Sequence, residues 1–563
     1  MAVMMVSAVT IAIIAYAIYK FIIYPTFISP LSRIPAAHPT AHFSSLWILH
    51  HRLHQRDTLV VHDAHTRLGP IVRIAPNEVA INSVDGGIKT IYTGGFEKGE
   101  WYQIGFANYG VEPMFAMPDR KHHGVRKRLV SNVYAKSTLL GSAAIRGITS
   151  VVVRHRLRDR IRNDMRRCER EGGSVEFYDI FAAAALDFVS AYVFGVTNAT
   201  NLLEDQKESV RFLREFKARQ VYTFWRQECP LFTKFMSSLG LLWTIVPRWV
   251  DESSEKIERW NMRLCEAAEA SCAIGETNHD HPECFPTVYA QLREGLIKVT
   301  AQSIGKSMTS VDQATRVEIA AELLDHTLAG LDTSSITLTY LAWEVSRPSN
   351  RHWQDLLRRE VRNLPRQLRW DARALDGLPI LHAIIMETLR LHAPIPGQQP
   401  RVTPTVSEGC SPTILCGHEL PTGVRVQAQA WSLHRNKDVF PDPEAFEPRR
   451  WLPPGGNSLP VTSSTTPEHA KEMARWFWAF SSGGRMCVGS NLAMLDMKAI
   501  VAGIWSRFET TAISGDESMR HNGGYLAEPL GAGPGGYCRL QVRGLDDDKD
   551  DDDDDVKSQE TAV

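Results

Sequence analysis

The stretch Phe480-Ser-Ser-Gly-Gly-Arg485-Met-Cys487-Val-Gly489 decides the fold class and most of the chemistry of this chain. It places one cysteine in a glycine-rich loop, beside an arginine, just before a helical pattern that begins near Ser490. Glycines let backbone N–H groups approach a sulfur atom, and a helix N-terminus favours negative charge. The pattern predicts a stabilised thiolate at Cys487, the kind of sulfur that ligates iron in haem-based oxygen activation. Arg485 is predicted to pair with a carboxylate of the ligand.

A second constellation lies upstream, at the centre of a leucine-rich helical pattern from Asp312 to Ser346 that should be buried. Its central residues are Ala329-Gly330-Leu-Asp332-Thr333-Ser. The Ala-Gly step predicts a local bulge at which a flat cofactor can approach. Asp332 and Thr333 then offer an acid and an alcohol that hold water and pass protons to bound dioxygen. The alternative is that these hydroxyls only bond back to the carbonyls of their own helix.

A third pattern is the Glu387-x-x-Arg390 pair on a predicted helix from Leu381 to His392. Glutamate and arginine at this spacing share one helix face. Arg450, in Phe446-Glu-Pro-Arg-Arg450-Trp, is predicted to complete a Glu–Arg–Arg cluster. Such a cluster, when buried, fixes geometry rather than adding much stability.

Three further basic residues are candidates for holding anionic groups. Arg401 begins a predicted strand after a proline-rich turn, and His123 and Lys127 lie one helical turn apart. They could hold a second carboxylate of the ligand. The run around His123 also fits a solvated or partner-facing helix, and both interpretations stay open.

The first residues predict a membrane anchor. Residues 1–24 hold Lys20 as their one charge and are long enough to cross a hydrocarbon core of about 30 Å. The positive residues Lys20 and Arg33 follow the apolar run, which predicts that the body faces the cytosol. Prolines in residues 25–40 predict a semi-rigid hinge. The rivals are a cleaved signal peptide and a buried terminal helix. We expect removal of residues 1–24 to release the protein from membranes.

Composition narrows what the body can be. The 563 residues are 44% hydrophobic and 23% charged, which excludes a disordered chain, a collagen and a polytopic transporter. The nine cysteines form no C-x-x-C pair, which argues against a disulfide framework or a zinc site. Net charge is −1, although the predicted disordered tail 546–563 is strongly acidic, so the rest is mildly basic. Nucleic-acid binding is not indicated.

Short strand patterns at Ile71–Ile74 and Glu78–Ile81, and again between Pro394 and Trp431, interrupt patterns that are otherwise mostly helical. We therefore predict a mainly α fold with a minor β part, an N-terminal transmembrane helix and one catalytic domain over residues 41–545.

In the order of these motifs along the sequence the chain resembles the cytochrome P450 superfamily. Its local sequence resembles that of membrane-bound fungal members. The resemblance implies Cys487 as the axial ligand of haem b, Asp332 and Thr333 as the catalytic acid–alcohol pair, and a structural Glu387–Arg390–Arg450 triad. The residues that it implies around the cofactor are Arg485, Arg401, His123, Lys127, Phe480, Gly489, Ala329 and Gly330. His123 and Lys127 depart from the family, which often has tryptophan and arginine there.

The implied activity is a monooxygenase that inserts one atom of O2 into a lipophilic small molecule, by hydroxylation or epoxidation, as a tailoring step in secondary-metabolite biosynthesis. The implied partners are NADPH-cytochrome P450 reductase, or cytochrome b5 beside it, at the endoplasmic reticulum membrane. Two alternatives stay open: an electron-independent haem-thiolate isomerase or dehydratase, and a non-enzymatic membrane-anchored haem binder. NADPH dependence separates the isomerase from the monooxygenase, and product formation separates the haem binder.

The substrate pocket is predicted to have apolar walls, although core packing would give the same composition. The candidate wall residues are Phe106, Phe115, Leu328, Ile395 and Leu530.

Overall fold

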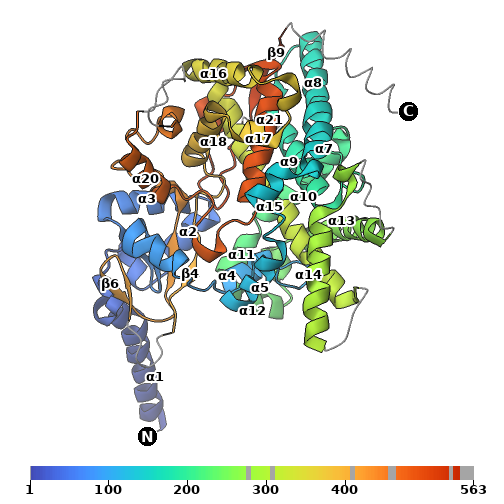
Figure 1. The fold of residues 1–563 in the computed structure, drawn as a ribbon. Helices are drawn as coiled ribbons and strands as arrows, with labels where there is room; N and C mark the ends of the chain where they lie inside the picture. The colour runs from blue at the N-terminus through green and yellow to red at the C-terminus, as the bar shows by residue number, and fades with distance from the viewer. Residues whose placement is uncertain are drawn as a thin grey trace.

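The computed structural model describes residues 2–273, 281–304, 311–405, 412–453, 464–531 and 537–545 (Figure 1). The acidic tail predicted at 546–563 lies outside these residues. The described chain is mainly helical with small sheets, as the sequence predicts.

The α-helices are α1 (Ala2–Ile18), α2 (Leu46–Leu53), α3 (Asp57–Leu68), α4 (Glu100–Phe106), α5 (Arg120–Val130), α6 (Lys136–Gly141), α7 (Ala143–Ile148), α8 (Arg158–Glu171), α9 (Phe177–Phe194), α10 (Gln206–Gln220), α11 (Thr223–Glu228), α12 (Pro230–Ser238), α13 (Arg248–Ala273), α14 (Thr287–Ile304), α15 (Gln313–Ser346), α16 (Arg351–Arg362), α17 (Ala372–Asp376), α18 (Pro379–Leu391), α19 (Ala430–Leu433), α20 (Pro467–Trp476), α21 (Ser490–Trp505) and α22 (Asp516–Met519). Wider or tighter helical turns form η1 (Tyr19–Ile28), η2 (Pro30–Arg33), η3 (Pro39–His42), η4 (Val84–Thr93), η5 (Thr149–Leu157), η6 (Leu242–Thr244), η7 (Pro282–Cys284), η8 (Pro348–Asn350), η9 (Arg366–Leu368), η10 (Pro448–Trp451) and η11 (Gly483–Arg485).

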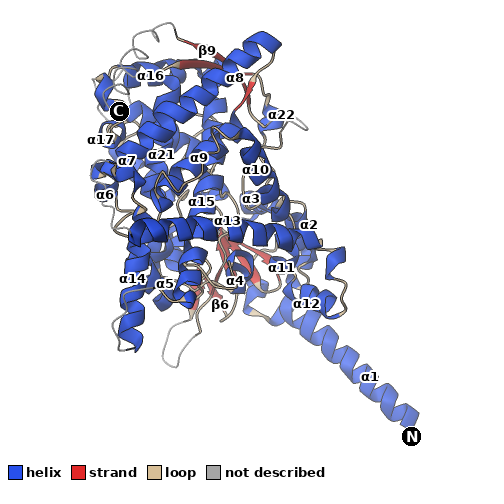
Figure 2. Ribbon diagram, turned by 90° about the vertical axis from the view of Figure 1, so that its right-hand side faces the viewer, coloured by secondary structure: helices blue, strands red, loops and turns tan. Residues whose placement is uncertain are grey.

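The strands form three small sheets, drawn in red in Figure 2. They are β1 (Ile71–Ala75), β2 (Glu78–Ile81), β3 (Val175–Glu176), β4 (Arg401–Val402), β5 (Thr413–Leu415), β6 (His418–Leu420), β7 (Arg425–Ala428), β8 (Phe508–Ala512) and β9 (Arg539–Gly544). The four-stranded sheet has the order β1-β2-β7-β4, and β4 pairs with β7 so that Arg401 lies opposite Val426. This pairing fixes the backbone of Arg401, which the sequence predicts to bind an anionic group.

Helix α15 runs through the centre of the body and packs along α9. Gly330 permits this packing, because a Cβ atom there would lie 3.0 Å from a methyl group of Val189. The bulge predicted at Ala329-Gly330 is wrong, since α15 is continuous from Gln313 to Ser346. The glycine serves contact between two helices rather than a break in one of them.

The N-terminal helix projects from the body (Figures 1 and 2). Its apolar helical segment, Met5–Ile28, is unburied throughout and contains Pro25, so helical backbone continues four residues beyond the predicted anchor. The wider turns of η1 accommodate a proline ring that a regular α-helix would exclude. Phe177–Phe194 is similarly apolar, but it is 94% buried and forms the core helix α9.

A second apolar surface lies on α12 and the turn that follows it. Its exposed side chains include Leu231, Phe235 and Trp243, which are 81%, 58% and 56% exposed. Both views place α12 at the end of the body from which α1 projects (Figures 1 and 2). Exposed apolar patches of this kind mark interaction surfaces, and tryptophan is favoured at membrane interfaces.

The structure therefore leads to a different expectation for anchor removal. Deleting residues 2–28 should leave the protein bound to lipid vesicles in a flotation assay, because the α12 surface remains. Adding Leu231→Glu and Phe235→Glu to that deletion should release it. Free protein after the deletion alone would show that the α12 surface does not contact lipid.

Candidate active site

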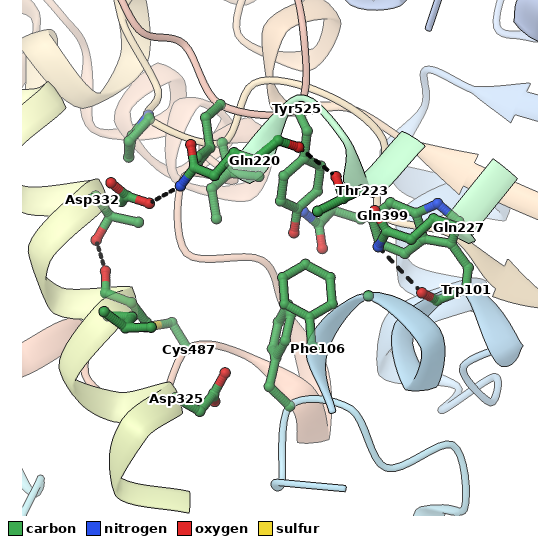
Figure 3. Close-up of a pocket in the computed structure, with 18 of the residues that line it drawn as sticks. Trp101, Phe106, Gln220, Thr223, Gln227, Asp325, Asp332, Gln399, Cys487 and Tyr525 are labelled. Atoms are coloured by element: carbon green, nitrogen blue, oxygen red, sulfur yellow. Dashed lines mark hydrogen bonds between the residues drawn. The ribbon is translucent and has the colours of Figure 1, made fainter. Parts of the chain in front are cut away.

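A cavity of about 990 Å³ lies between α15, the roof helices α10 and α11, helix α4 and the cysteine loop (Figure 3). This volume is at the upper end of the range for small-molecule sites, about 300–1,000 Å³. Cys487, Asp332 and Thr333 all line it. Cys487 lies more than 150 positions after the adjacent Asp332 and Thr333, and the fold brings all three to one chamber.

The cysteine loop is held by close backbone contacts. Gly483 has a φ of +72°, and a Cβ atom there would lie 2.2 Å from the carbonyl oxygen of Tyr92, so another residue would not fit. The amide of Cys487 donates to the carbonyl of Phe480 at 3.0 Å. A Cβ atom on Gly489 would meet nothing within 4 Å, which leaves the loop open towards the cavity.

The sulfur of Cys487 lies in a low-dielectric setting that contains directed donors. Burial raises the pKa of the thiol, whereas the amides of Gly489 and Ser490 and the ammonium of Lys127 act in the opposite direction. These donors oppose the rise in the thiol pKa, but burial outweighs them, so the stabilised thiolate at Cys487 stays a prediction. A sulfur that faces a chamber and is supported by amides fits an axial iron ligand.

Four basic groups lie along the cavity near this loop: Lys98, His123, Arg401 and Arg485. Among the described residues none of the four forms a salt bridge with a carboxylate. Arg485 donates to the carbonyls of Met117 and Pro118, both at 2.6 Å, and Arg401 donates to the hydroxyl of Tyr102 at 2.9 Å.

Burial, and then repulsion between these groups, lowers the pKa values of His123 and Arg485. Burial and then Arg485 and Lys98 lower the pKa of His123 to about 3. Burial and then Arg401 lower the pKa of Arg485 to about 10. Buried cations without counter-charges are costly, so this cluster is built to receive an anion. The carboxylates of haem match this requirement.

Lys127 also lines the cavity, as the predicted role at the cofactor requires. Its Nζ donates to the carbonyls of Gly484 and Met486 at 3.0 and 3.1 Å. It thus ties α5 to the cysteine loop, in addition to its electrostatic effect on Cys487.

On α15, Asp332 points toward the roof helix α10. Its carboxylate accepts from Lys217 at 2.6 Å and from Gln220 at 3.0 Å, both on α10 (Figure 3). Lys217 also pairs with Glu528, which accepts from the hydroxyl of Tyr178 at 3.1 Å. Burial raises the pKa of Asp332, and Lys217 opposes that rise. The acid is therefore coupled to the roof of the cavity.

Thr333 donates its hydroxyl hydrogen to the carbonyl of Ala329 at 2.9 Å. This is the back-bonding that the sequence left as an alternative. It does not remove the chemical use of the side chain, because Oγ1 still has lone pairs that face the cavity. In this arrangement Thr333 accepts hydrogen bonds, and proton donation belongs to another group.

The predicted Glu387 cluster assembles around one buried carboxylate. Arg390 binds Glu387 through two contacts of 2.8 Å, and Nε of Arg450 lies 3.3 Å from the same carboxylate. Trp451 donates to it at 2.8 Å. Arg390 also donates to the carbonyls of His434, Pro443 and Ala445. The cluster thus joins α18 to the loop that leads to η10, and its role is to hold geometry.

Four of the five predicted pocket residues line the cavity: Phe106, Phe115, Leu328 and Ile395. The cofactor candidates Phe480, Gly489, Ala329 and Gly330 line it as well. Leu530 does not, and that prediction is wrong: its side chain is 48% exposed. Its amide bonds to the carbonyl of Arg520, and Gly531 bonds to that of Ser518, which turns the chain outward. Leu526 and Glu528 line the cavity from this segment instead.

Sequence reasoning missed several polar and aromatic residues of the site. They are Lys98, Trp101, Lys217, Gln220, Asp325, Gln399 and Tyr525. Asp325 carried a usable signal, since it precedes Ala329 and Thr333 at spacings of four and eight on one helix stripe. The lysines carried none, because isolated lysines are typical of solvated surfaces.

A cavity-facing cysteine sulfur, a cluster of basic groups without carboxylate partners and an acid–alcohol pair fit a haem-thiolate enzyme. The family model for cytochrome P450 matches residues 42–529. The chain therefore belongs to the cytochrome P450 family, and it is a monooxygenase that uses a haem-thiolate cofactor, O2 and a redox partner.

The chain is similar to fungal proteins over most of its length. The cytochrome P450 monooxygenase orf2 of Aspergillus niger is 27% identical over 518 residues, covering 89% of this chain and 90% of that protein. The cytochrome P450 monooxygenase aflV of Aspergillus parasiticus is 28% identical over 85% of each chain. The cytochrome P450 monooxygenase avaI of Aspergillus versicolor is 27% identical over 77% of this chain and 93% of its own length.

Proposed function

We propose that this monooxygenase inserts one oxygen atom into a lipophilic small molecule, by hydroxylation or epoxidation, in a tailoring step of secondary metabolism. The apolar and aromatic cavity walls, including Phe106, Phe115 and Ile395, support a lipophilic substrate. The similarity to Aspergillus monooxygenases supports the fungal type that the sequence resemblance implies.

The cofactor in this proposal is haem b, with Cys487 as its axial ligand. Arg401, Arg485 and His123 are assigned to its carboxylates, and Lys98 adds a further basic group, whose pKa is lowered by burial and by the neighbouring arginines. When bound, the haem supplies the oxygen-activating chemistry, and the protein supplies orientation and charge. The observation that carries the proposal is the cavity-facing Cys487 sulfur with its two amide donors, in a cavity that also holds four basic groups without a carboxylate partner.

The proton path proposed here runs from Asp332 to the cavity. Asp332 holds a proton more readily than a solvated carboxyl, because burial raises its pKa. Thr333 Oγ1 accepts a hydrogen bond from water or from a protonated oxygen in the cavity, since its own hydrogen is engaged by Ala329. General acid assistance of this type contributes roughly 10²–10⁴-fold to a rate.

For the chain as a whole we propose an anchor over residues 1–24, a hinge over 25–40 and a cytosolic catalytic domain over 41–545 at the endoplasmic reticulum membrane. NADPH-cytochrome P450 reductase is the proposed electron donor. The exposed apolar helix Met5–Ile28 and the α12 surface support a membrane location.

The experiment is product profiling in a host that expresses the full chain with and without a cytochrome P450 reductase. The proposal expects oxidised products that need the reductase and NADPH. Products that form without the reductase and NADPH would favour the isomerase. Haem-loaded protein that yields no product in extracts of lipophilic metabolites would favour the haem binder.

Lys217→Met should shift the pH dependence of coupling, measured as product formed per NADPH consumed. Lys217 lowers the pKa of Asp332, so its removal raises that pKa further. Asp332 then stays protonated to higher pH, so the pH above which coupling falls should also be higher. Lys217→Arg should restore the original profile. Lys207→Met is the matched control, since Lys207 is exposed on the same helix. An unshifted pH profile of coupling in Lys217→Met would show that Lys217 does not influence the proton path.

A further inference from the structure

Asp325 lies on the cavity-facing stripe of α15. Asp325, Ala329 and Thr333 are spaced by four residues and all line the cavity. Figure 3 shows the Asp325 carboxyl group pointing into the chamber, on the side where Cys487 lies. Neither the catalytic role assigned to Asp332 nor the cation cluster near Cys487 requires this group.

The carboxyl group of Asp325 has no hydrogen bond or ion pair with any other part of the chain that the structure describes. By contrast, Asp332 has two donors on α10. Glu228, which lines the same cavity, accepts from Arg52 at 2.9 Å and from the indole of Trp101 at 2.8 Å. A carboxyl group that lines a cavity without a partner is available to a ligand of opposite charge.

The charged groups near Asp325 are already engaged. Lys98 donates to the carbonyl of Phe115 and lies over the rings of Phe115 and Tyr102, at 3.9 and 4.1 Å from their centroids. His326 lies 3.0 Å from the hydroxyl of Tyr134 and 3.2 Å from Glu322. Neither side chain therefore pairs with Asp325.

Burial is the main influence on the titration of Asp325 and, with repulsion from Glu322, raises its pKa to about 7, while His326 and Lys98 oppose the rise. Cys487 also interacts electrostatically with Asp325. The carboxyl is thus poised to ionise when a cation binds.

Aromatic rings line the same cavity as this carboxyl group. Phe106 lies 4.8 Å from Phe115 in an edge-to-face contact, and Tyr525 lies 5.5 Å from Trp101, between ring centroids. All four rings line the cavity. Aromatic faces attract cations, and the attraction is strongest where water is excluded. A carboxyl group and aromatic faces together are the groups that recognise a protonated nitrogen in an otherwise apolar ligand.

We propose that Asp325 binds a protonated amine of the substrate, so that this enzyme oxidises lipophilic amines. This inference rests on the proposed function, because it names the substrate class of the same cavity. Asp325 positions the substrate through its nitrogen while the apolar remainder fills the chamber. A neutral hydroxylated substrate is the competing class, and the experiment below distinguishes the two.

The test compares two probes in the haem-loaded, full-length protein. One is N,N-diisopropyl-4-phenylbutylamine, whose hindered nitrogen is unsuited to iron ligation. The other is the isostere in which CH replaces that nitrogen. Dissociation constants are measured by calorimetry for the natural protein, for Asp325→Asn and for Asp251→Asn. Asp251 also lines the cavity, but it is paired with Arg226, so it is the matched control.

The amine should bind more tightly than its isostere, and Asp325→Asn should weaken amine binding by about 10- to 100-fold, the size of a charge-assisted contact. Isostere binding should change little, and Asp251→Asn should retain the preference. Amine affinity should rise with pH through about 7 in the natural protein, as Asp325 ionises, and this rise should disappear in Asp325→Asn. Equal affinities for the two probes, or an unchanged preference in Asp325→Asn, would overturn the proposal.

Folding and function are read separately. The thiolate-type carbon monoxide band of Asp325→Asn reports intact haem binding, so lost affinity with that band present is not a folding failure. If the natural protein lacks the band, the proposed function fails. If the band and NADPH-dependent products are present but the amine preference is absent, only the amine inference fails.

Discussion

Replacing Cys487 with alanine abolishes the thiolate-type carbon monoxide band and reduces oxygenation to background. No other described cysteine lines the cavity, and none is supported by the amides that Gly489 and Ser490 provide. Loss of the axial sulfur removes the iron ligand itself, so the effect should exceed that of any other single substitution. The measurement is the reduced carbon monoxide difference spectrum, followed by product analysis with reductase and NADPH.

Cys168→Ala is the control for this experiment, because Cys168 is a partly exposed residue of α8 outside the cavity. It should retain both the band and the products. A Cys487→Ala protein that kept the thiolate-type band would mean that another sulfur ligates the iron.

Thr333→Ala should separate electron use from product formation. The substitution removes a hydroxyl group that bonds to Ala329 and little volume, so the fold and haem binding should persist. Without this acceptor, electrons from NADPH reduce dioxygen to hydrogen peroxide, and product formation falls by roughly 10²–10⁴-fold. NADPH consumed, peroxide formed and product formed are measured in one assay.

Two variants sharpen this result. Thr333→Ser keeps the hydroxyl group and should recover coupling. Thr337→Ala removes a similar back-bonded hydroxyl one turn further along α15, outside the cavity, and should leave coupling intact. Unchanged coupling in Thr333→Ala would show that Thr333 is not part of the proton path. It would also favour the isomerase alternative.

The parts of this fold that sequence predicts best are those where one local pattern has one physical solution. The glycine-rich loop around Cys487 is such a case. Gly483 lies so close to the Tyr92 carbonyl that only glycine fits there, so the position of this glycine in the sequence identifies the turn. The apolar helix α15 and the sheet around Arg401 follow from periodicity and turn residues. The Glu387–Arg390–Arg450 contacts could be expected because helix spacing brings the first two residues to one face.

The remainder depends on contacts between distant segments. Gly330 suggested a bulge from sequence, but its reason is Val189, on a helix about 140 residues earlier. Lys98 and Lys217 resemble surface lysines until the fold buries them beside Phe115 and Asp332. Leu530 has the composition of a pocket wall, yet backbone bonding in its own loop turns it outward.

Isotope labelling tests the central claim most directly. A host that expresses the chain with a reductase is grown under ¹⁸O₂, and the new products are analysed by mass spectrometry against an Asp332→Asn, Thr333→Ala control. The account predicts products that each carry one ¹⁸O atom per oxidation step, absent without NADPH and strongly reduced in the control. Products that form without ¹⁸O or without electrons would contradict the account.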